Sequence, residues 1–445
     1  MEDAMLPGAM ADHPLDPSVL RVPVPRTSAA GRLAGPMALG VVAIFLGAAH
    51  QAPAPVQERL VLETLSGKQE IRPAASPGEF TFGPRGTVFL RYEGPRPEMP
   101  RSPARLVLSD GQRWMGGVAG GSGDTLRFSA SLGAQLSVSV DHVARLEFDG
   151  RLPDADRGSL TPAAEGDRLY WVHDGALERV DGSFEAFADE GVVLTGVLGK
   201  RTFPWDEVGA LLVAALEEGQ APARPEGIPL VVDTDDGSRI AGAFVGPTGA
   251  DDAGSRPPGF ELETAFGARV RVPFARVWEA ALDDGCFAYL SDLPPARAQA
   301  GSLFGDELGL SWPHQVDRSV VGTPLSVAGR RQARGLGVHA PSRLVWDLGP
   351  AAGSEVRPAR ELAGEVGIDD SVRTTSARGC VRFQVHVDGV LRWDSGPVRG
   401  GEEARPIPRI DLRGAKELAL VVEQDEDSFV ADRADWLRLL LVREP

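Results

Sequence analysis

Candidate catalytic residues are present in this chain, but none of them stands in a recognised catalytic arrangement. A serine hydrolase of the α/β type carries Gly-x-Ser-x-Gly at a turn from strand to helix. The run Gly120-Gly-Ser-Gly123 is followed by Asp124 instead of a glycine. The sequence also lacks the Walker and Rossmann glycine patterns and has no histidine pair at zinc-ligand spacing. These absences favour a protein that is not an enzyme.

The charged residues argue against nucleic acid as a partner and show no pattern specific to a glycosidase. Glycosidases place two carboxylates on opposite sides of a cleft, and this chain has 63 Asp and Glu residues from which a pair could be chosen. The formal net charge of −17 argues against nucleic acid, because a phosphate backbone is bound by clustered positive charge. We interpret the short basic run of Arg330, Arg331 and Arg334 as a solvated loop.

Two cysteines, Cys286 and Cys380, are present, without Cys-x-x-Cys or cysteine-histidine spacing. A zinc ribbon or redox motif is therefore not expected. In an oxidising compartment the two could form one disulfide, and two buried thiols are the alternative. The pair Asp235-Asp236 could be mistaken for a calcium loop, but a turn ending at Gly237 explains both residues without a metal.

The N-terminal residues contain an apolar run from Leu33 to Ala49 that carries no charge and follows several arginines. This pattern fits the hydrophobic region of a signal peptide, and its length also suits a short uncleaved membrane anchor. We therefore predict residues 1–55 to be a signal peptide or anchor helix with disordered flanks. Either reading places the rest outside the cytoplasm, as a secreted, periplasmic or membrane-anchored protein that meets the membrane only through residues 33–49.

Residues 56–289 are predicted to be a β-rich repeat region, with units at about 105–150, 165–215 and 228–282. In the first and third units an apolar run leads into an Asp-Gly turn, which supplies the positive φ of a tight hairpin. Each unit is too small to bury its own apolar face, so neighbouring units are expected to pack together. Small SH3-like or Sm-like β-barrels suit this length. We interpret the repeats as structural, with a protein-interaction platform as the functional alternative.

The C-terminal region, residues 290–445, follows a proline-rich linker and contains clearly alternating strands. Val381, Phe383, Val385 and Val387 are expected on one face of a strand, with Arg382, Gln384 and His386 on the other. Asp388-Gly389 predicts a hairpin turn after this strand. Several strands at this spacing indicate a β-sandwich or jelly roll, so the whole chain is predicted to be all-β.

Five segments of this region carry a resemblance, and they are Gly335-Leu-Gly-Val-His339, Gly367-Ile-Asp-Asp370, Val387-Asp-Gly389, Gly414-Ala-Lys416 and Asp432-Arg-Ala-Asp-Trp436. In their order and amino-acid sequence they resemble segments of the NPCBM family, the novel putative carbohydrate-binding modules. The resemblance covers about a third of the chain. It implies a galactose-binding-like β-sandwich of the jelly-roll type. Family members are accessory modules of secreted glycoside hydrolases or of large surface proteins, and some bind galactose-type sugars.

The resemblance also implies a set of carbohydrate-binding residues within these segments and the hairpin that follows. They are His339, Asp369, Asp370, Trp393, Asp432 and Asp435. Each also has a structural interpretation: a packed histidine for His339, and loop-anchoring carboxylates for Asp369 and Asp370. Trp346 and Trp436 lie in apolar stretches and are expected in the core. No cofactor is expected, although a structural calcium held by loop carboxylates is an alternative.

Together these observations predict a non-catalytic, extracytoplasmic carbohydrate-binding protein, in which the loops of the C-terminal jelly roll bind the sugar. Galactose-type glycans are the expected ligand class, and other envelope proteins are further candidate partners. The alternative is a structural or protein-interaction module of the cell envelope that binds no sugar.

Overall fold

The computed structural model describes most of the chain after residue 57. The described residues are 58–98, 101–152, 160–173, 175–197, 199–214, 225–250, 256–300, 312–349, 358–375, 378–425 and 431–443. The predicted signal or anchor, residues 1–55, lies outside them. Within these ranges, no helix has the length and apolar character needed to cross a membrane.

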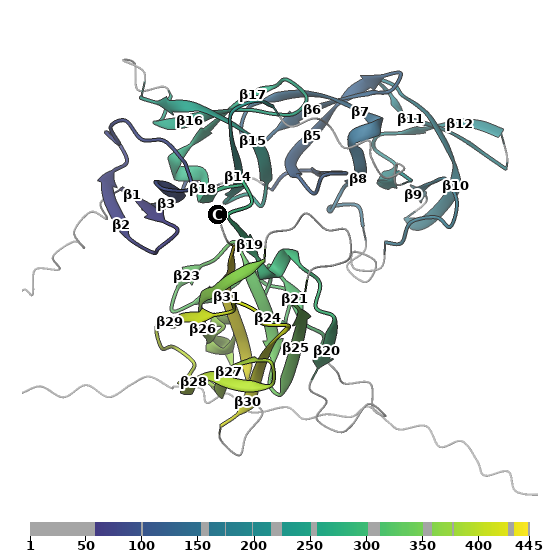
Figure 1. Cartoon of the computed structure of the whole chain (residues 1–445). Helices are drawn as coiled ribbons and strands as arrows, with labels where there is room; N and C mark the ends of the chain where they lie inside the picture. Colours follow the sequence, from purple (N-terminus) through teal and green to yellow (C-terminus); the bar gives the residue numbers. More distant parts are fainter. Residues whose placement is uncertain are drawn as a thin grey trace, which may run out of the picture. The chain divides into compact units, whose positions relative to one another are not determined.

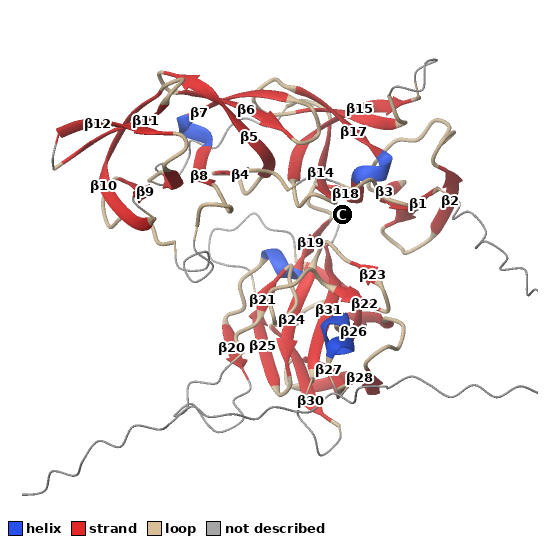
Figure 2. Cartoon of the chain, turned by 180° about the vertical axis from the view of Figure 1, so that it is seen from behind, coloured by secondary structure: helices blue, strands red, loops and turns tan. Residues whose placement is uncertain are grey.

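Strands account for nearly all regular structure, which confirms the all-β prediction (Figure 1). The helices in the described ranges are short 3-10 turns, drawn in blue in Figure 2. Two of them, η1 (Val140–His142) and η2 (Phe274–Arg276), occupy the same place in two of the repeat units, directly before the last strand.

Three units of five strands make up most of the repeat region. The first contains β4 (Ala104–Leu108), β5 (Arg113–Ser122), β6 (Thr125–Ala130), β7 (Gln135–Ser139) and β8 (Val143–Glu147). The second contains β9 (Asp167–His173), β10 (Ala176–Phe187), β11 (Gly191–Gly196), β12 (Gly199–Pro204) and β13 (Val208–Leu212). The third contains β14 (Ile228–Thr234), β15 (Arg239–Thr248), β16 (Gly259–Glu263), β17 (Arg269–Pro273) and β18 (Val277–Leu282).

All three units share one antiparallel strand order, with the first strand between the second and the fifth. The orders are β7-β6-β5-β4-β8, β12-β11-β10-β9-β13 and β17-β16-β15-β14-β18. Asp-Gly turns connect the first two strands of the first and third units. Gly111 and Gly237 have φ of +88° and +94°, a conformation that glycine adopts without steric cost.

The expectation of small closed barrels was wrong, because no sheet closes in the described ranges. The fifth strand of each unit pairs with a strand outside its unit instead. β8 pairs with β13, and β18 pairs with β3 (Thr87–Glu93), which continues to β1 (Arg59–Thr64) and β2 (Gln69–Pro73). A single bridge between Arg113 and Arg239 links β5 to β15, so that all eighteen strands belong to one sheet. One apolar core, which includes Trp114, serves all three units.

The C-terminal domain consists of two sheets that enclose a second core (Figure 1). The first sheet has the order β21 (Gln315–Val316), β24 (Gly335–His339), β31 (Arg433–Arg443), β26 (Ala359–Ile368) and β29 (Arg405–Asp411), with β19 (Phe287–Tyr289) also paired to β31. The second has the order β20 (Arg297–Ala300), β25 (Ser342–Asp347), β30 (Glu417–Gln424), β27 (Cys380–Val387) and β28 (Val390–Arg399). The hairpin β22 (Ser326–Val327) and β23 (Arg330–Arg331) stands apart.

The alternation predicted for residues 381–387 is confirmed, because the apolar side chains of β27 are all buried. Phe383 packs edge-on against Trp436, with ring centroids 5.0 Å apart. Trp346 is also buried, and its indole N–H donates to the Leu293 carbonyl at 2.8 Å. Both tryptophans therefore have the core role expected of them. Cys286 and Cys380 are buried as well.

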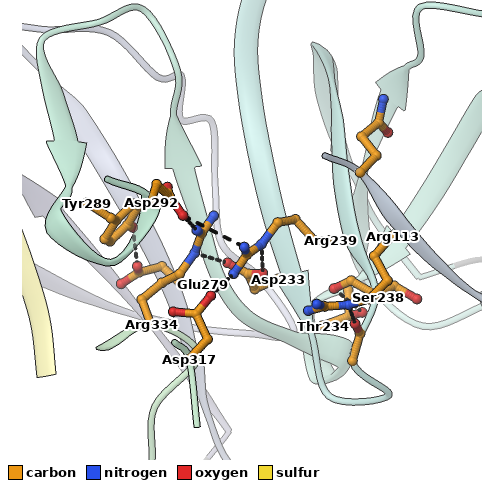
Figure 3. A network of polar contacts seen from close by, with 12 residues as sticks. Arg113, Asp233, Thr234, Ser238, Arg239, Glu279, Tyr289, Asp292, Asp317 and Arg334 are labelled. Carbon is orange, nitrogen blue, oxygen red and sulfur yellow. Dashed lines mark hydrogen bonds and ion pairs between the residues drawn. The ribbon is translucent and has the colours of Figure 1, made fainter. Parts of the chain in front are cut away.

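A buried ion network connects the C-terminal domain to the repeat sheet (Figure 3). Arg334 Nε lies 2.8 Å from Asp233 Oδ2, and Arg239 Nε lies 2.7 Å from the other carboxylate oxygen of Asp233. Arg239 also contacts Asp317 at 2.7 Å, and Arg334 contacts Asp292 at 2.5 Å. The interpretation of the basic run as a solvated loop is thus wrong for Arg334, which is 3% exposed because these carboxylates neutralise it.

Candidate functional site

Five of the six predicted site residues lie at one end of the sheet formed by β24, β31 and β26. His339 ends β24, Asp369 and Asp370 follow β26, and Asp432 and Asp435 stand at the start of β31. The strand register explains the grouping, because Asp435 is paired with both Gly337 and Gly367 across its two neighbours. The sixth residue, Trp393, lies on β28 of the other sheet, paired with Val385.

Asp369 and Asp435 are neighbouring carboxyl groups in the interior of the domain. Both are almost completely buried. Burial, together with the neighbouring Asp369, raises the pKa of Asp435 well above its usual range, which favours the neutral form of this carboxyl group. The Asp369 carboxylate accepts the amides of Ser326 at 3.1 Å and Ser371 at 2.9 Å. Asp369 therefore fastens the β22 hairpin and the turn η5 (Asp370–Thr374) to the sheet.

Asp370 and Asp432 also hold loops through backbone amides. The Asp370 carboxylate accepts from the Ser326 hydroxyl at 2.6 Å and from the Gly329 amide at 2.7 Å. Asp432 is fully buried and accepts from the Cys380 amide at 2.9 Å. Carboxylates of this kind fix the shape of loops, which is the structural interpretation that the sequence allowed.

His339 is 7% exposed, and its Nδ1 donates to the Ala340 carbonyl at 2.8 Å. Burial lowers the pKa of this imidazole, which favours the neutral ring. The ring stacks on Trp312, with centroids 4.6 Å apart and planes at 18°. The described residues contain no group of three or more His, Cys, Asp or Glu side chains arranged to hold a metal ion.

An open pocket of about 470 Å³ lies beside these anchored loops. It is lined by Ala328, Arg373, Arg378, Gly401 and Glu403. Arg373 is positioned by its own turn, because its guanidinium lies 3.9 Å from the Asp370 carboxylate. The buried acidic residues thus shape the loops that carry the exposed charges of the pocket.

Close packing of two backbone segments places Arg378 and Glu403 on the same pocket. The Gly400 amide donates to the Gly379 carbonyl at 3.4 Å. A Cβ atom at Gly400 would lie 2.1 Å from the Arg378 carbonyl oxygen, so only glycine permits this approach. Gly379 itself has a φ of +70°, which turns the chain from Arg378 into β27.

The pocket offers two guanidinium groups and one carboxylate to a ligand. Arg378 and Glu403 are exposed and make no ion pair with any other described residue. Guanidinium and carboxylate groups can hold vicinal hydroxyls by paired hydrogen bonds. The sequence analysis missed all three side chains, because they stand in loops outside the family-like segments. The one local signal is the spacing of Arg373, three residues after Asp370, which in a helical turn predicts a contact between the two side chains.

Residues 287–441 match the family model described as the NPCBM/NEW2 domain. The C-terminal third is an NPCBM/NEW2 domain. The pocket and the six predicted site residues all lie within it. The match begins at Phe287, the first residue of β19, which is hydrogen-bonded to β31 of the same domain.

A curated relative also covers only part of the chain. It is alpha-1,3-galactosidase B of Akkermansia muciniphila, which is 33% identical over 128 residues. The match spans 28% of this chain and 15% of the galactosidase.

Two solved structures are among those matched by the chain. CBM51 from Clostridium perfringens GH95, solved with methyl-galactose, is 23% identical and covers 35% of this chain and 99% of that chain, with a TM-score of 0.30. The tandem CBM51 modules of the family 98 glycoside hydrolase from Streptococcus pneumoniae SP3-BS71 are 14% identical, covering 62% of this chain and 88% of theirs, with a TM-score of 0.28.

Proposed function

We propose that the NPCBM/NEW2 domain binds a neutral carbohydrate in the pocket lined by Arg373, Arg378 and Glu403. The family match supports carbohydrate as the ligand class, and the presence of this pocket supports the proposed binding position. Its volume of about 470 Å³ lies within the usual range of small-molecule sites. Two of the six residues predicted from the sequence, Asp369 and Asp370, hold the loops beside this pocket through hydrogen bonds to backbone amides.

A galactose-type sugar is the proposed ligand class. The relative with 33% identity carries the name of an enzyme that acts on α-1,3-linked galactose, which supports this choice. Vicinal hydroxyls of a hexose suit the forked donors of Arg378 and the acceptor pair of Glu403. The domain acts without catalysis and outside the cytoplasm in this proposal, in keeping with the absence of a catalytic motif in the sequence.

A structural or protein-interaction module is the second candidate. Two observations favour it: the described lining of the pocket has no aromatic side chain for a sugar face, and the domain is fastened to the repeat sheet by buried charges. In this case the loops of the NPCBM/NEW2 domain would contact protein.

Binding of the full chain to galactose, methyl-galactoside and short galactosylated glycans, measured by calorimetry, tests the proposal. Arg378→Gln and Glu403→Gln are each expected to weaken binding roughly tenfold, because each removes charge-assisted hydrogen bonds. The matched control is Arg392→Gln, an exposed arginine on β28 that does not line the pocket. If folded protein binds none of these sugars, or both pocket variants bind like the control, carbohydrate binding at this pocket is refuted.

A further inference from the structure

We propose that a second site, a basic groove in the repeat region, binds an acidic oligosaccharide. The groove has a volume of about 1000 Å³. Four arginines line it: Arg96, Arg101, Arg151 and Arg331. The first three come from the repeat region, and Arg331 comes from β23 of the NPCBM/NEW2 domain. Such a cluster is unexpected in a chain with a net charge of −17.

Arg96 is held in place as a cation by backbone carbonyls. Its guanidinium donates to the carbonyls of Ala275 and Tyr92, both at 3.1 Å, and lies 3.7 Å above the centre of the Trp278 ring. No described carboxylate forms an ion pair with it. Burial lowers the pKa of Arg96 to about 10, so the group stays charged at neutral pH. An anionic ligand would therefore find a positioned donor that forms no ion pair with a described carboxylate.

The other arginines are also without a carboxylate partner in the described parts of the chain. Arg151 donates to the carbonyls of Trp205 and Val208, the latter at 2.8 Å, and lies over the Phe148 ring. Arg101 and Arg331 are exposed, and neither forms an ion pair with a described residue. Their side chains are free to turn toward a ligand in the groove.

Each carboxylate along the same groove already has an arginine partner outside the groove lining. Asp149 lies 2.7 Å from Arg105, and Asp235 lies 2.9 Å from the buried Arg276. Asp236 contacts the same guanidinium at 3.5 Å and accepts the Ser238 amide at 2.9 Å. The groove therefore combines three carboxylates that pair with arginines outside its lining and four arginines that form no ion pair with a described carboxylate. This excess of arginines favours a locally positive potential.

The size of the groove points to an oligomeric ligand. A neighbouring cavity of about 960 Å³ shares Arg96, Trp278 and Arg331 with it. That cavity also contains Arg330, which lies 4.0 Å from Glu93, and three further glutamates. Arginines spaced along two joined cavities suit a chain with anionic groups at intervals, held by forked contacts to carboxylate or sulfate.

An acidic glycan fits this surface better than a nucleic acid. Single-stranded nucleic acids are held by bases that stack on open aromatic faces. Trp278 is covered by the Arg96 guanidinium, and Tyr92 is 4% exposed, so neither offers a free face. The inference does not depend on sugar binding by the NPCBM/NEW2 pocket, whose lining shares no residue with the groove and only Glu403 with the neighbouring cavity.

Calorimetric titration of the full chain with hexasaccharides of hyaluronan, which carries carboxylates, and of chondroitin sulfate, which also carries sulfates, tests the inference. A neutral chitin hexasaccharide and a single-stranded hexanucleotide serve as comparisons. We expect both acidic sugars to bind, the neutral one not to bind, and affinity to fall as sodium chloride is raised. The two acidic probes show which anionic group the groove prefers.

The double variant Arg101→Gln/Arg331→Gln is expected to weaken acidic-sugar binding by roughly tenfold or more. Arg85→Gln/Arg392→Gln, at two exposed arginines outside both cavities, is the charge-matched control. Arg378→Gln removes a charge from the other pocket and should leave acidic-sugar binding unchanged. Equal binding of the neutral sugar, tighter binding of the hexanucleotide, or no difference between the double variant and its control would each overturn the inference.

Discussion

At the scale of single residues, the buried carboxyl pair of Asp369 and Asp435 shows how tertiary context sets the role of an aspartate. The two side chains are chemically identical, yet only Asp369 has backbone amides to stabilise its charge. Asp435 has no such donors and is buried next to another carboxylate, so its neutral form is favoured. Asp369 holds two of the loops from which the proposed sugar pocket is built.

Asp435→Asn should remove a pH dependence of stability. A raised pKa means that the folded protein keeps a proton that the unfolded chain releases above about pH 4. The contribution of Asp435 to stability therefore falls as the pH rises from about 4 toward the folded pKa of this residue. As the pH rises, the unfolding free energy of Asp435→Asn should therefore increase relative to that of the natural protein, by up to about 1.4 kcal/mol for each pH unit.

Urea unfolding of both proteins between pH 4.5 and 7.5 measures this difference. Asp347→Asn, at an exposed aspartate of β25, is the control and should show no such trend. A difference between Asp435→Asn and the natural protein that stays constant with pH would contradict a protonated Asp435.

At the scale of elements, the turn between β28 and β29 is what brings the two halves of the proposed pocket together. Its Gly400 packs against the backbone of Arg378, while Glu403 follows three residues later. The strands on either side are fixed by alternation and core packing, but the pocket depends on this one close approach.

Gly400→Ala should change the geometry of the pocket more than the fold of the domain. The added methyl group would meet the Arg378 carbonyl and Val372, forcing the turn away at a cost of about 1–3 kcal/mol. Sugar affinity should fall with it, because Arg378 and Glu403 separate. Gly349→Ala is the control, since a Cβ there meets no atom within 4 Å. Thermal unfolding and sugar titration of both variants give the comparison, and unchanged stability and affinity in Gly400→Ala would show that the approach is not needed.

At the scale of the whole molecule, the repeat sheet and the NPCBM/NEW2 domain share buried charges and buried rings. The ring of Phe287, at the start of the domain, lies 4.8 Å from that of Phe89 in β3. Leu440 of β31 belongs to the core of the repeat sheet although its neighbours Leu439 and Leu441 face the core of the sandwich. Together with the network around Arg334, these contacts connect the domain to the repeat region.

Arg334→Gln should therefore destabilise the protein strongly. Removing one partner leaves the buried Asp233 with only Arg239, and breaking a buried pair costs about 3–5 kcal/mol. Arg331→Gln, three residues earlier and exposed, should change stability little. Chemical unfolding curves distinguish the two, and equal stability of both variants would rule out a structural role for the Arg334 network.

Much of the secondary structure could be predicted because its signals are local. The alternation in residues 381–387 and the turn at Asp388-Gly389 depend only on neighbouring residues, and both are present. The NPCBM resemblance was confirmed over residues 287–441 for the same reason, since its segments are short and ordered along the chain. The predicted sugar-binding role of His339 and the aspartates stays a prediction.

The amino-acid sequence by itself determined the all-β class, the positions of the turns and the family of the C-terminal domain. Only the tertiary structure decided that the units form one open sheet. The fifth strand of each unit pairs with a strand of another unit or of the N-terminal hairpin, and no local sequence pattern encodes this pairing. The tertiary structure also decided that Arg334 is buried while Arg331 is exposed, and that Arg373, Arg378 and Glu403 meet in a pocket. The common reason is that burial and proximity depend on segments far apart in the chain, whereas alternation and turns depend on adjacent residues.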